Sequence, residues 1–265
     1  MSGAPDQLAP HDWGATPELY GPRHDYREAL LLRRLLPRLP GPEVLNAGAG
    51  AGSLTLKMVA AGLRVTSVDA SPELCDWTRA RLAERPDGDD HPVAVGDLQA
   101  LDLPDASFDA AVCGEVLEHL DDDRAGAGEL ARVLRPGGLL VASVPANPYR
   151  YDWVDHWAGH RRRYTAEGFR ALLEDAGFVD VDVQGWGFPL TGLYHRLVYR
   201  PLLRRRLARG GGRAGGGAGP RGVPARAAAT VLRAAFELDT AFVGRRPGYL
   251  GLIAVARRAG SRPSA

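Results

Sequence analysis

Cysteine and lysine are almost missing from this sequence of 265 residues, which contains two cysteines, Cys75 and Cys113, and a single lysine, Lys57. One cysteine lies in a helical pattern and the other in an apolar strand pattern. The pair therefore shows neither a disulfide framework nor the spacing of a metal site. So few cysteines are typical of a reducing compartment, and the expected localisation is cytoplasmic.

Long apolar runs are absent as well. No stretch of about 18 apolar residues occurs, so no transmembrane helix is expected, and the opening residues MSGAPDQLAPHDWG contain no apolar signal core. The formal net charge is only +1, so the chain as a whole does not attract nucleic acid or a membrane. A composition of 45% hydrophobic and 25% charged residues predicts a globular protein with a core of its own.

Apolar runs typical of strands alternate with helical patterns along most of the chain. Strands are predicted at 43–48, 63–69, 92–97, 108–115, 139–145, 179–185 and 248–258. Helices are predicted at 24–36, 53–62, 71–85, 122–134 and 165–177. This order predicts an α/β fold whose doubly wound sheet is mostly parallel, with helices on both faces. Ligands bind such sheets at the carboxyl ends of the strands.

Capping and turn residues set several of these boundaries. Ser71 is the predicted N-cap of one helix, with Pro72 at its first position. Thr165 is the predicted N-cap of another helix, which Gly177 ends. The sequence RPGG at 135–138 predicts a turn before the fifth strand.

One segment between the sixth and seventh predicted strands interrupts the alternation. It holds an arginine-rich helical pattern, a glycine-rich stretch at 210–222 that predicts a flexible linker, and a second helical pattern. The expected organisation is an N-terminal helical segment that covers the ligand, an α/β core, a helical insertion, and a last strand with a tail. These parts span 1–42, 43–187, 188–243 and 244–265.

Three glycines, Gly48, Gly50 and Gly52, follow the first predicted strand in the sequence EVLNAGAGAGSLTL. The dinucleotide fingerprint needs a third glycine where this chain has Ser53, and the G-K-[ST] of a Walker loop is missing. Alternate glycines suit either a ligand that approaches the backbone closely or a tight turn between strand and helix.

Two acidic residues at the ends of the next strands favour the ligand. Asp69 closes the second predicted strand, where a carboxylate can accept hydrogen bonds from a ribose diol. Asp97 closes the third, where a carboxylate can accept a hydrogen bond from an adenine amine.

Residues 44–144 resemble the core of a class I S-adenosylmethionine-dependent methyltransferase. The resemblance rests on the glycine loop, the acid at the second strand, and the runs GDLQALDLPDASFD, EVLEHL and LRPGGLLV. The order of these motifs is similar to that of the group containing the ubiquinone-biosynthesis methyltransferases. The resemblance implies a Rossmann-like sheet of seven strands with the last one antiparallel, and S-adenosylmethionine as cofactor. It also implies methyl transfer to a small-molecule acceptor by in-line displacement, with oxygen preferred over nitrogen and carbon.

The resemblance also implies which residues contact the cofactor. The implied contacts are Asn46, Gly48, Gly50, Gly52, Asp69, Ala70, Asp97, Leu98, Cys113, Gly114 and Glu115. Asn46 departs from the family, which usually has an acid there to face the cofactor's ammonium. Arg27, on the predicted N-terminal helix together with His24 and Tyr26, is a candidate partner of the methionine carboxylate.

A hydroxyl acceptor needs a base, and His119, His160 and Tyr164 are the candidates. His119 follows the fourth strand, whereas the other two lie in the run DHWAGHRRRYT together with His156; each could instead be a structural residue. Glu115, Glu118 and His119 match a metal-binding arrangement of some ubiquinone-pathway relatives. The same residue types recur in relatives without metal, so no metal is expected.

Two other functions compete with this prediction. Arginines of the insertion would support an RNA or DNA methyltransferase, against which stand the net charge and the lack of a recognisable nucleic-acid module. A cofactor-binding protein without transferase activity is the other alternative. The same arginine-rich helix could contact an anionic membrane surface, and nucleic acid is not an expected partner.

Overall fold

The computed structural model describes residues 21–208, 231–239 and 249–260. Seven strands form one sheet in the order β3-β2-β1-β4-β5-β7-β6. All neighbouring pairs are parallel except the two that β7 makes with β5 and β6, which are antiparallel. The predicted sheet with an antiparallel last strand is therefore confirmed. The strands are β1 (Glu43–Ala47), β2 (Arg64–Asp69), β3 (Val93–Val95), β4 (Phe108–Gly114), β5 (Leu134–Pro145), β6 (Phe178–Trp186) and β7 (Gly251–Arg258).

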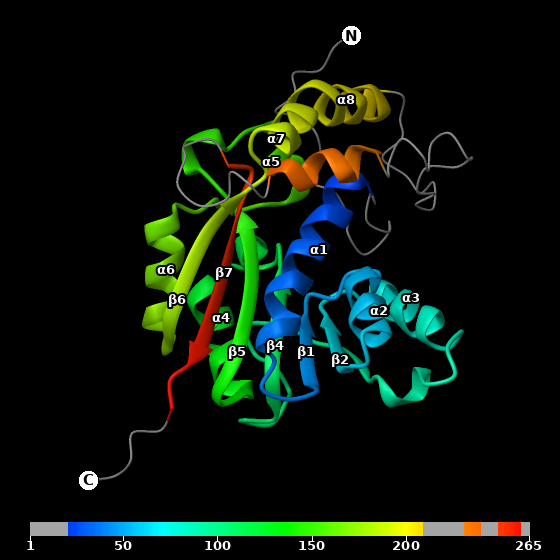
Figure 1. Ribbon diagram of the computed structural model, residues 1–265, viewed down its shortest axis with the longest axis vertical. Coiled ribbons are helices and arrows are strands. Elements are labelled where there is room, and N and C mark those ends of the chain that lie inside the picture. The colour runs from blue at the N-terminus through cyan, green and yellow to red at the C-terminus, as the bar shows by residue number, and fades with distance from the viewer. Residues whose placement is uncertain (1–20, 209–230, 240–248, 261–265) are drawn as a thin grey trace.

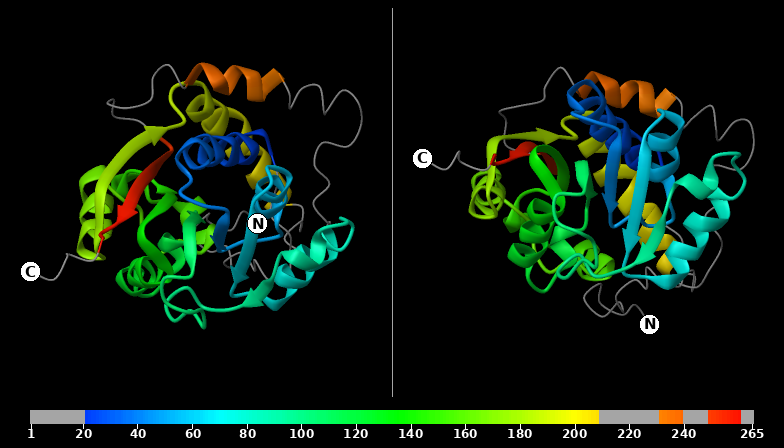
Figure 2. Two further views of the ribbon diagram at one scale, coloured as in Figure 1. Left: turned by 60° about the horizontal axis from the view of Figure 1, so that its bottom comes forward. Right: turned by 90° about the horizontal axis from the view of Figure 1, so that it is seen from below.

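Helices cover both faces of the sheet, as Figures 1 and 2 show. Apolar side chains of α1 (Pro22–Leu35) and α2 (Ser53–Ala60) form one core with alternate residues of β1, β4 and β5. The other core lies on the opposite face, beneath α4 (Asp123–Val133) and α6 (Ala166–Asp175). Helix α3 (Pro72–Leu82) packs near β2 and β3. Because the inner strands are buried on both faces of the sheet, their sequences are continuous apolar runs.

The capping predictions are confirmed at both helices. The Ser71 hydroxyl accepts the backbone N–H of Leu74 at the start of α3. The Thr165 hydroxyl does the same for Gly168 at the start of α6. Helix α6 is followed by Gly177, whose φ of 94° lies in the left-handed region that favours glycine.

The predicted turn at 135–138 is wrong in one respect, because these residues lie within β5. Leu134 already pairs with Phe108, and Leu139 pairs with Ala110, so the register shifts between the two pairs. The four intervening residues bulge out of the ladder, and Gly137 there has a φ of 77°.

The described parts of the insertion lie beyond the carboxyl ends of the parallel strands, as Figure 1 shows. One continuous helical stretch comprises α7 (Leu190–Tyr194), the π-helical turn η6 (His195–Tyr199) and α8 (Arg200–Ala208). A helix over 231–237 packs on α1 through Phe236, which is buried, and Asp239 accepts the backbone N–H groups of Leu190 and Thr191. The predicted glycine linker lies outside the described residues. Of the helices described, none has both the length and the apolar character to cross a membrane.

Candidate functional site

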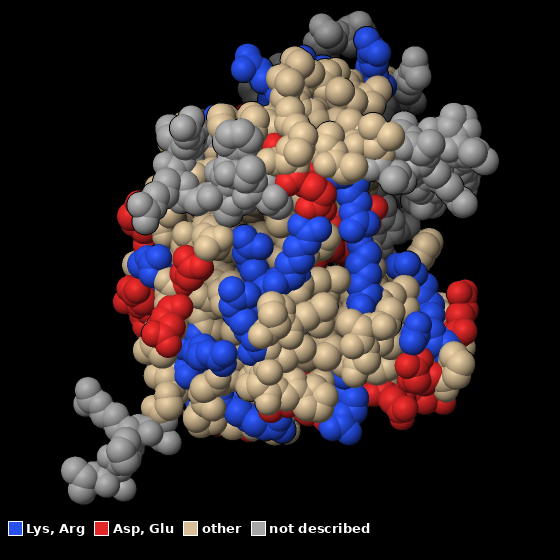
Figure 3. Space-filling model, in the orientation of Figure 1, with Lys and Arg blue, Asp and Glu red and all other residues tan. Residues whose placement is uncertain are grey.

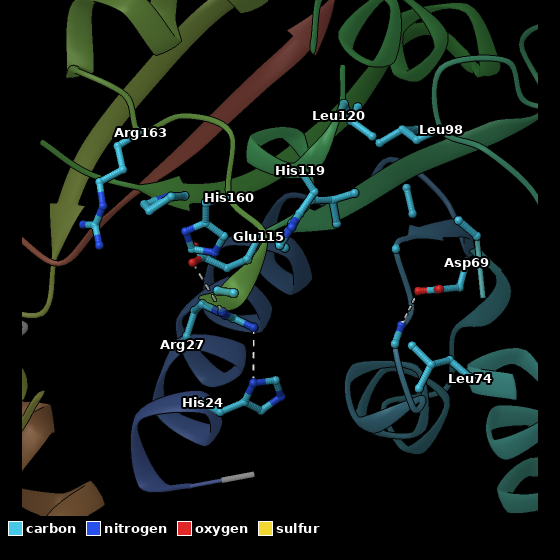
Figure 4. Close-up of a pocket in the computed structure, with 18 of the residues that line it drawn as sticks. His24, Arg27, Asp69, Leu74, Leu98, Glu115, His119, Leu120, His160 and Arg163 are labelled. Carbon is cyan, nitrogen blue, oxygen red and sulfur yellow. Dashed lines mark hydrogen bonds and ion pairs between the residues drawn. The ribbon is translucent and has the colours of Figure 1, made fainter. Parts of the chain in front are cut away.

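A cavity of about 360 Å³ opens at the carboxyl ends of the strands. Its walls come from the glycine loop after β1, the ends of β2 and β4, helix α1, the short helix α5 (Trp153–Ala158) and the insertion. Figure 4 shows two groups of side chains across it, with Asp69, Leu74 and Leu98 apart from Arg27, Glu115, His119 and His160. This is the edge at which the alternating pattern predicts a ligand site.

The glycine loop turns sharply at one wall of the cavity. Gly48, Gly50 and Gly52 have φ angles of 73°, 55° and 80°, a left-handed conformation that side chains disfavour. Gly48 and Gly50 line the cavity. A Cβ on Gly48 would lie 2.2 Å from the Cγ2 atom of Val116, so this glycine also lets two loops meet.

Gly52 does not line the cavity, contrary to its predicted contact with the cofactor. It is the N-cap residue of α2, and a Cβ there would lie 2.8 Å from the Thr78 hydroxyl oxygen. Its lack of a side chain serves the packing of α2 against α3. The tight-turn interpretation thus holds for Gly52, whereas Gly48 and Gly50 face the cavity.

Asp69 joins the end of β2 to the glycine loop. One carboxylate oxygen accepts the Gly50 N–H at 2.8 Å, and the other accepts the Ser71 N–H at 3.0 Å. Burial raises the pKa of Asp69, and the two hydrogen bonds oppose that rise. Each oxygen keeps a second lone pair for a ligand. Ala70 lines the cavity beside it.

The predicted adenine end combines one acid with apolar side chains. Asp97 lies two residues beyond the end of β3, and its carboxylate accepts the backbone N–H of Gln99 at 2.9 Å. Leu98 lines the cavity beside it, with Leu74 and Leu101. This wall suits a flat apolar ring with polar edge groups.

Glu115 and Arg27 face each other at the end of β4. Their closest charged atoms, Oε2 and Nη1, are 3.6 Å apart, and the Arg27 Nη2 donates to His24 Nδ1 at 3.2 Å (Figure 4). Glu115 has a φ of 61°, a strained value for a residue with a side chain. Gly114, a predicted cofactor contact, also lines the cavity. Two buried atoms of the pair have no hydrogen-bond partner among the described residues, Arg27 Nε and Glu115 Oε1.

Glu118, His119 and His160 form a cluster in which one possible ligand atom of each lies within 4.8 Å of the others. His119 and His160 line the cavity, whereas Glu118 is fully buried. Burial and then the charge of Glu115 hold the pKa of Glu118 well above its usual range. Burial and then His160 lower the pKa of His119 to about 4.

Hydrogen bonds set the tautomers of the two histidines. His119 Nδ1 lies 3.3 Å from the Gly159 carbonyl oxygen, and His160 Nδ1 lies 2.8 Å from the Asp155 carboxylate. Both oxygens only accept, so both Nδ1 atoms carry the proton. In the neutral imidazoles, Nε2 is then the basic nitrogen.

Two predicted cofactor contacts point away from the cavity. Asn46 lies on β1, where its amide donates to the Thr55 hydroxyl at 2.9 Å in the packing against α2. Cys113 lies on β4 with its side chain in the core beneath α4 and α6. Side chains of a strand alternate between the faces of the sheet, and these two belong to the faces rather than to the strand ends.

Two candidates for facing the substrate, Tyr164 and His156, do not line the cavity, and neither does Tyr26, a candidate on the N-terminal helix. The Tyr164 side chain is buried, and its hydroxyl donates to Asp123 at 2.8 Å, so it does not line the cavity. His156 is exposed on α5 and stacks edge-on against Tyr151. Tyr26 is buried in the core between Trp186 and Phe236.

The far end of the cavity has an aromatic wall that motif reasoning missed. Its lining side chains are Val154, Trp157, Trp186, Tyr194, His195, Tyr199 and Leu250, with Arg23 and Arg163 among them. Trp157 lies in the run DHWAGHRRRYT, where only the histidines and the tyrosine were candidates, and Arg23 directly precedes His24 of the predicted N-terminal helix. Trp186 lies outside every motif of the sequence analysis.

Comparison with known proteins identifies the fold and the cofactor class. Residues 45–142 match the family model of a methyltransferase domain. A probable S-adenosylmethionine-dependent methyltransferase of Mycobacterium tuberculosis is 34% identical over 189 residues, which cover 70% of this chain and 62% of the relative. A ubiquinone biosynthesis O-methyltransferase of Xanthomonas campestris is 39% identical over 106 residues, which cover 40% of this chain and 44% of the relative.

A solved structure supports the fold. Phosphoethanolamine N-methyltransferase 2 of Haemonchus contortus, in complex with S-adenosyl-L-methionine, superimposes with a TM-score of 0.62 at 17% identity, covering 88% of this chain and 52% of that one. The chain thus spans less than two thirds of the lengths of these relatives. Together, the strand order, the glycine loop and the family match show that residues 45–142 form a methyltransferase domain with the fold of the class I S-adenosylmethionine-dependent methyltransferases.

Proposed function

We propose that this chain transfers a methyl group from S-adenosylmethionine to a small-molecule acceptor, most readily at oxygen. The observation that carries the proposal is the division of one cavity into two ends. A glycine loop and Asp69 lie at one end, and an aromatic wall with two histidines lies at the other. When bound, the cofactor supplies an activated methyl group on a sulfonium.

The cavity residues fit this cofactor at three points. Asp69 has lone pairs for a ribose diol, and Leu74, Leu98 and Leu101 form an apolar wall suited to adenine. Near Glu115 and Arg27, a buried donor and a buried acceptor lack partners among the described residues. An amino acid group, with its carboxylate and ammonium, would satisfy both atoms, whose desolvation is otherwise uncompensated.

The histidines would hold the acceptor and remove its proton. His119 and His160 line the cavity, and each presents Nε2 as its basic nitrogen. Asp155 accepts from His160 Nδ1 and from the Arg163 guanidinium, which fixes the ring. A positioned base contributes typically ~10²–10⁴-fold to proton transfer. An aromatic wall excludes water from the acceptor.

The insertion would cover the acceptor end. Tyr194, His195 and Tyr199 line the cavity from one side of the helical stretch over 190–208. On its other side, Leu193, Leu197 and Leu202 are exposed. We propose that the part of the insertion described over residues 188–208 acts as a lid. We also propose that its exposed side meets an anionic membrane surface from which an apolar acceptor enters.

Two measurements test the proposed function. Calorimetric titration with S-adenosylhomocysteine should give micromolar affinity for the wild type and a loss of at least tenfold in Asp69→Ala. The exposed Asp76→Ala on α3 is the matched control. Production of S-adenosylhomocysteine is then measured with phenol, carboxylate and amine acceptors. Binding without turnover of any of them would support the cofactor-binding alternative, and absence of binding would overturn the proposal.

A further inference from the structure

Positive charge gathers at the acceptor end of the cavity, around His195. Three arginines, Arg23, Arg163 and Arg200, act on the imidazole electrostatically. The charges of two of them are compensated by ion pairs, because Arg163 pairs with Asp155 and Arg200 pairs with Asp152. Arg23 has no carboxylate within ion-pair distance among the described residues. Counting the described residues alone, this end of the cavity therefore carries one uncompensated positive charge.

Arg23 is held in place by contacts that leave its charge unpaired. Its guanidinium lies over the Tyr199 ring, with the carbon 4.6 Å from the ring centroid, and its Nη1 lies 3.3 Å from His195 Nδ1. Arginine only donates, so His195 Nδ1 accepts this bond and the neutral imidazole carries its proton on Nε2. Both side chains therefore offer N–H donors at the cavity that they line.

The surroundings keep His195 neutral. Its side chain is 9% exposed, and burial followed by the charge of Arg23 lowers its pKa to about 2. His195 therefore adds a hydrogen-bond donor without adding charge. Arg23 also lies in the first turn of α1, whose N-cap residue, Gly21, makes no side-chain cap and lines the cavity. The positive end of the helix dipole adds to the field of the guanidinium.

Aromatic side chains surround this cationic corner. Trp157, Trp186 and Tyr194 line the same end of the cavity. The indole N–H of Trp186 is buried without a partner among the described residues. An apolar body next to a fixed cation matches an amphiphilic ligand, and one uncompensated charge matches one negative charge.

We propose that the acceptor is an apolar or aromatic molecule with a singly charged anionic group, such as a carboxylate, which Arg23 and His195 bind. The proposal rests on the proposed function, because it names the class of acceptor for the same cavity. It makes Arg23 a determinant of specificity, since a neutral analogue would leave this half-buried cation without an anionic partner.

Two matched fluorescent probes test the proposal without any methyl transfer. 1-Anilinonaphthalene-8-sulfonate carries one negative charge, and N-phenyl-1-naphthylamine is the same molecule without the sulfonate. With S-adenosylhomocysteine present to fill the cofactor end, the wild type should bind the sulfonate at least about tenfold more tightly than the neutral probe. Charge-assisted hydrogen bonds contribute enough binding free energy to account for a tenfold difference in affinity.

Variants then locate the charge. Arg23→Gln should weaken binding of the sulfonate about tenfold and leave that of the neutral probe within twofold, whereas Arg23→Lys should retain most of the preference. Arg196→Gln is the control, because it removes an exposed arginine that lies outside the cavity on the helical stretch that carries His195. Circular dichroism checks that each variant is folded. The ratio of the affinities of the wild type for the two probes tests the proposal even if a variant does not fold.

Several outcomes would overturn the proposal. They are equal affinities of the wild type for the two probes, no binding of the sulfonate, or an equal effect of Arg23→Gln and Arg196→Gln. The probes are also titrated without S-adenosylhomocysteine. If that product does not bind, the proposed function fails, while the comparison of the two probes still decides whether the anion site exists.

Discussion

The carboxylate of Glu115 lies 3.6 Å from the guanidinium of Arg27, across one edge of the cavity. The pair ties helix α1 to the end of β4, although the two residues are 88 positions apart in the chain (Figure 4). Glu115 keeps this position at the cost of a left-handed backbone, a strain that persists at sites where the surroundings require it. The pair therefore connects the covering helix with the floor of the cavity.

Glu115→Gln should weaken binding of S-adenosylhomocysteine at least about tenfold, because Arg27 would keep a buried charge without its partner and the cofactor's ammonium would lose an acceptor. Calorimetry measures the change. Glu43→Gln, which breaks an arginine–glutamate pair with Arg64 at the start of β1, away from the cavity, is the control. Equal affinities of the two variants would remove Glu115 from the proposed site.

Gly50→Val should abolish binding of S-adenosylhomocysteine and leave a folded protein. The added side chain would enter the cavity and oppose a φ of 55°. Gly62→Val tests the strain alone, since Gly62 has a φ of 83° and no atom near its missing Cβ. Both variants should lose about 1–2 kcal/mol of stability, and only Gly50→Val should lose the ligand. An unfolded Gly50→Val would show that this glycine is structural.

Glu28 should stabilise the fold in a pH-dependent way. Burial raises its pKa, but hydrogen bonds from His24 and Lys57 bring it down to about 2. For an acid whose pKa is lowered in the folded state, the stabilisation is present above about pH 4.5 and is lost as the pH falls through 2. At pH 7 Glu28→Gln should therefore reduce the free energy of unfolding by about 3 kcal/mol.

Urea denaturation at several pH values measures this effect. The difference between wild type and Glu28→Gln should shrink as the pH is lowered below about 4.5. The exposed Glu84→Gln should show little difference at any pH. A difference that stays constant with pH would mean that Glu28 acts through packing and not through its charge.

Methyl transfer should survive treatment with a chelator, although Glu118, His119 and His160 are close enough to hold an ion. The raised pKa of Glu118 favours its neutral form, so Glu118→Gln should keep the activity within a few fold. Activity is measured before and after dialysis against EDTA. Loss of activity that magnesium or zinc restores would make these three residues metal ligands.

The exposed side of the insertion helix should bind anionic vesicles. Residues 190–208 contain five arginines and no acid, and Leu193 and Leu197 are 54% and 61% exposed. Figure 3 shows uncharged surface flanked by basic side chains in this upper part of the molecule. Each basic residue near such a surface contributes about 1 kcal/mol.

Flotation with phosphatidylcholine vesicles, with and without phosphatidylglycerol, measures this binding. The double variant Leu193→Ser and Leu197→Ser should float less with anionic vesicles than the wild type does. Val231→Ser, at an apolar side chain exposed outside this helical stretch, is the control. Flotation that is independent of anionic lipid would contradict the membrane contact.

The sequence by itself determined the alternation of strands and helices, because apolar runs predict strands and Ser71 and Thr165 start helices. The antiparallel last strand, and the roles of the glycine loop and Asp69, came from the resemblance to a known family and not from a local rule. The bulge at 135–138 was not predicted, because a turn signal does not show whether the strand pairing ends there or continues with a shifted register.

Only the tertiary structure decided which side chains meet in the cavity. Asn46, Cys113 and Tyr164 lie beside residues of the cofactor or substrate end in the sequence, yet each points into packed interior. Arg23 and His195 are 172 positions apart and come together because α1 and the insertion cover the same strand ends. Contacts of such separation depend on how the elements pack, which no local pattern records.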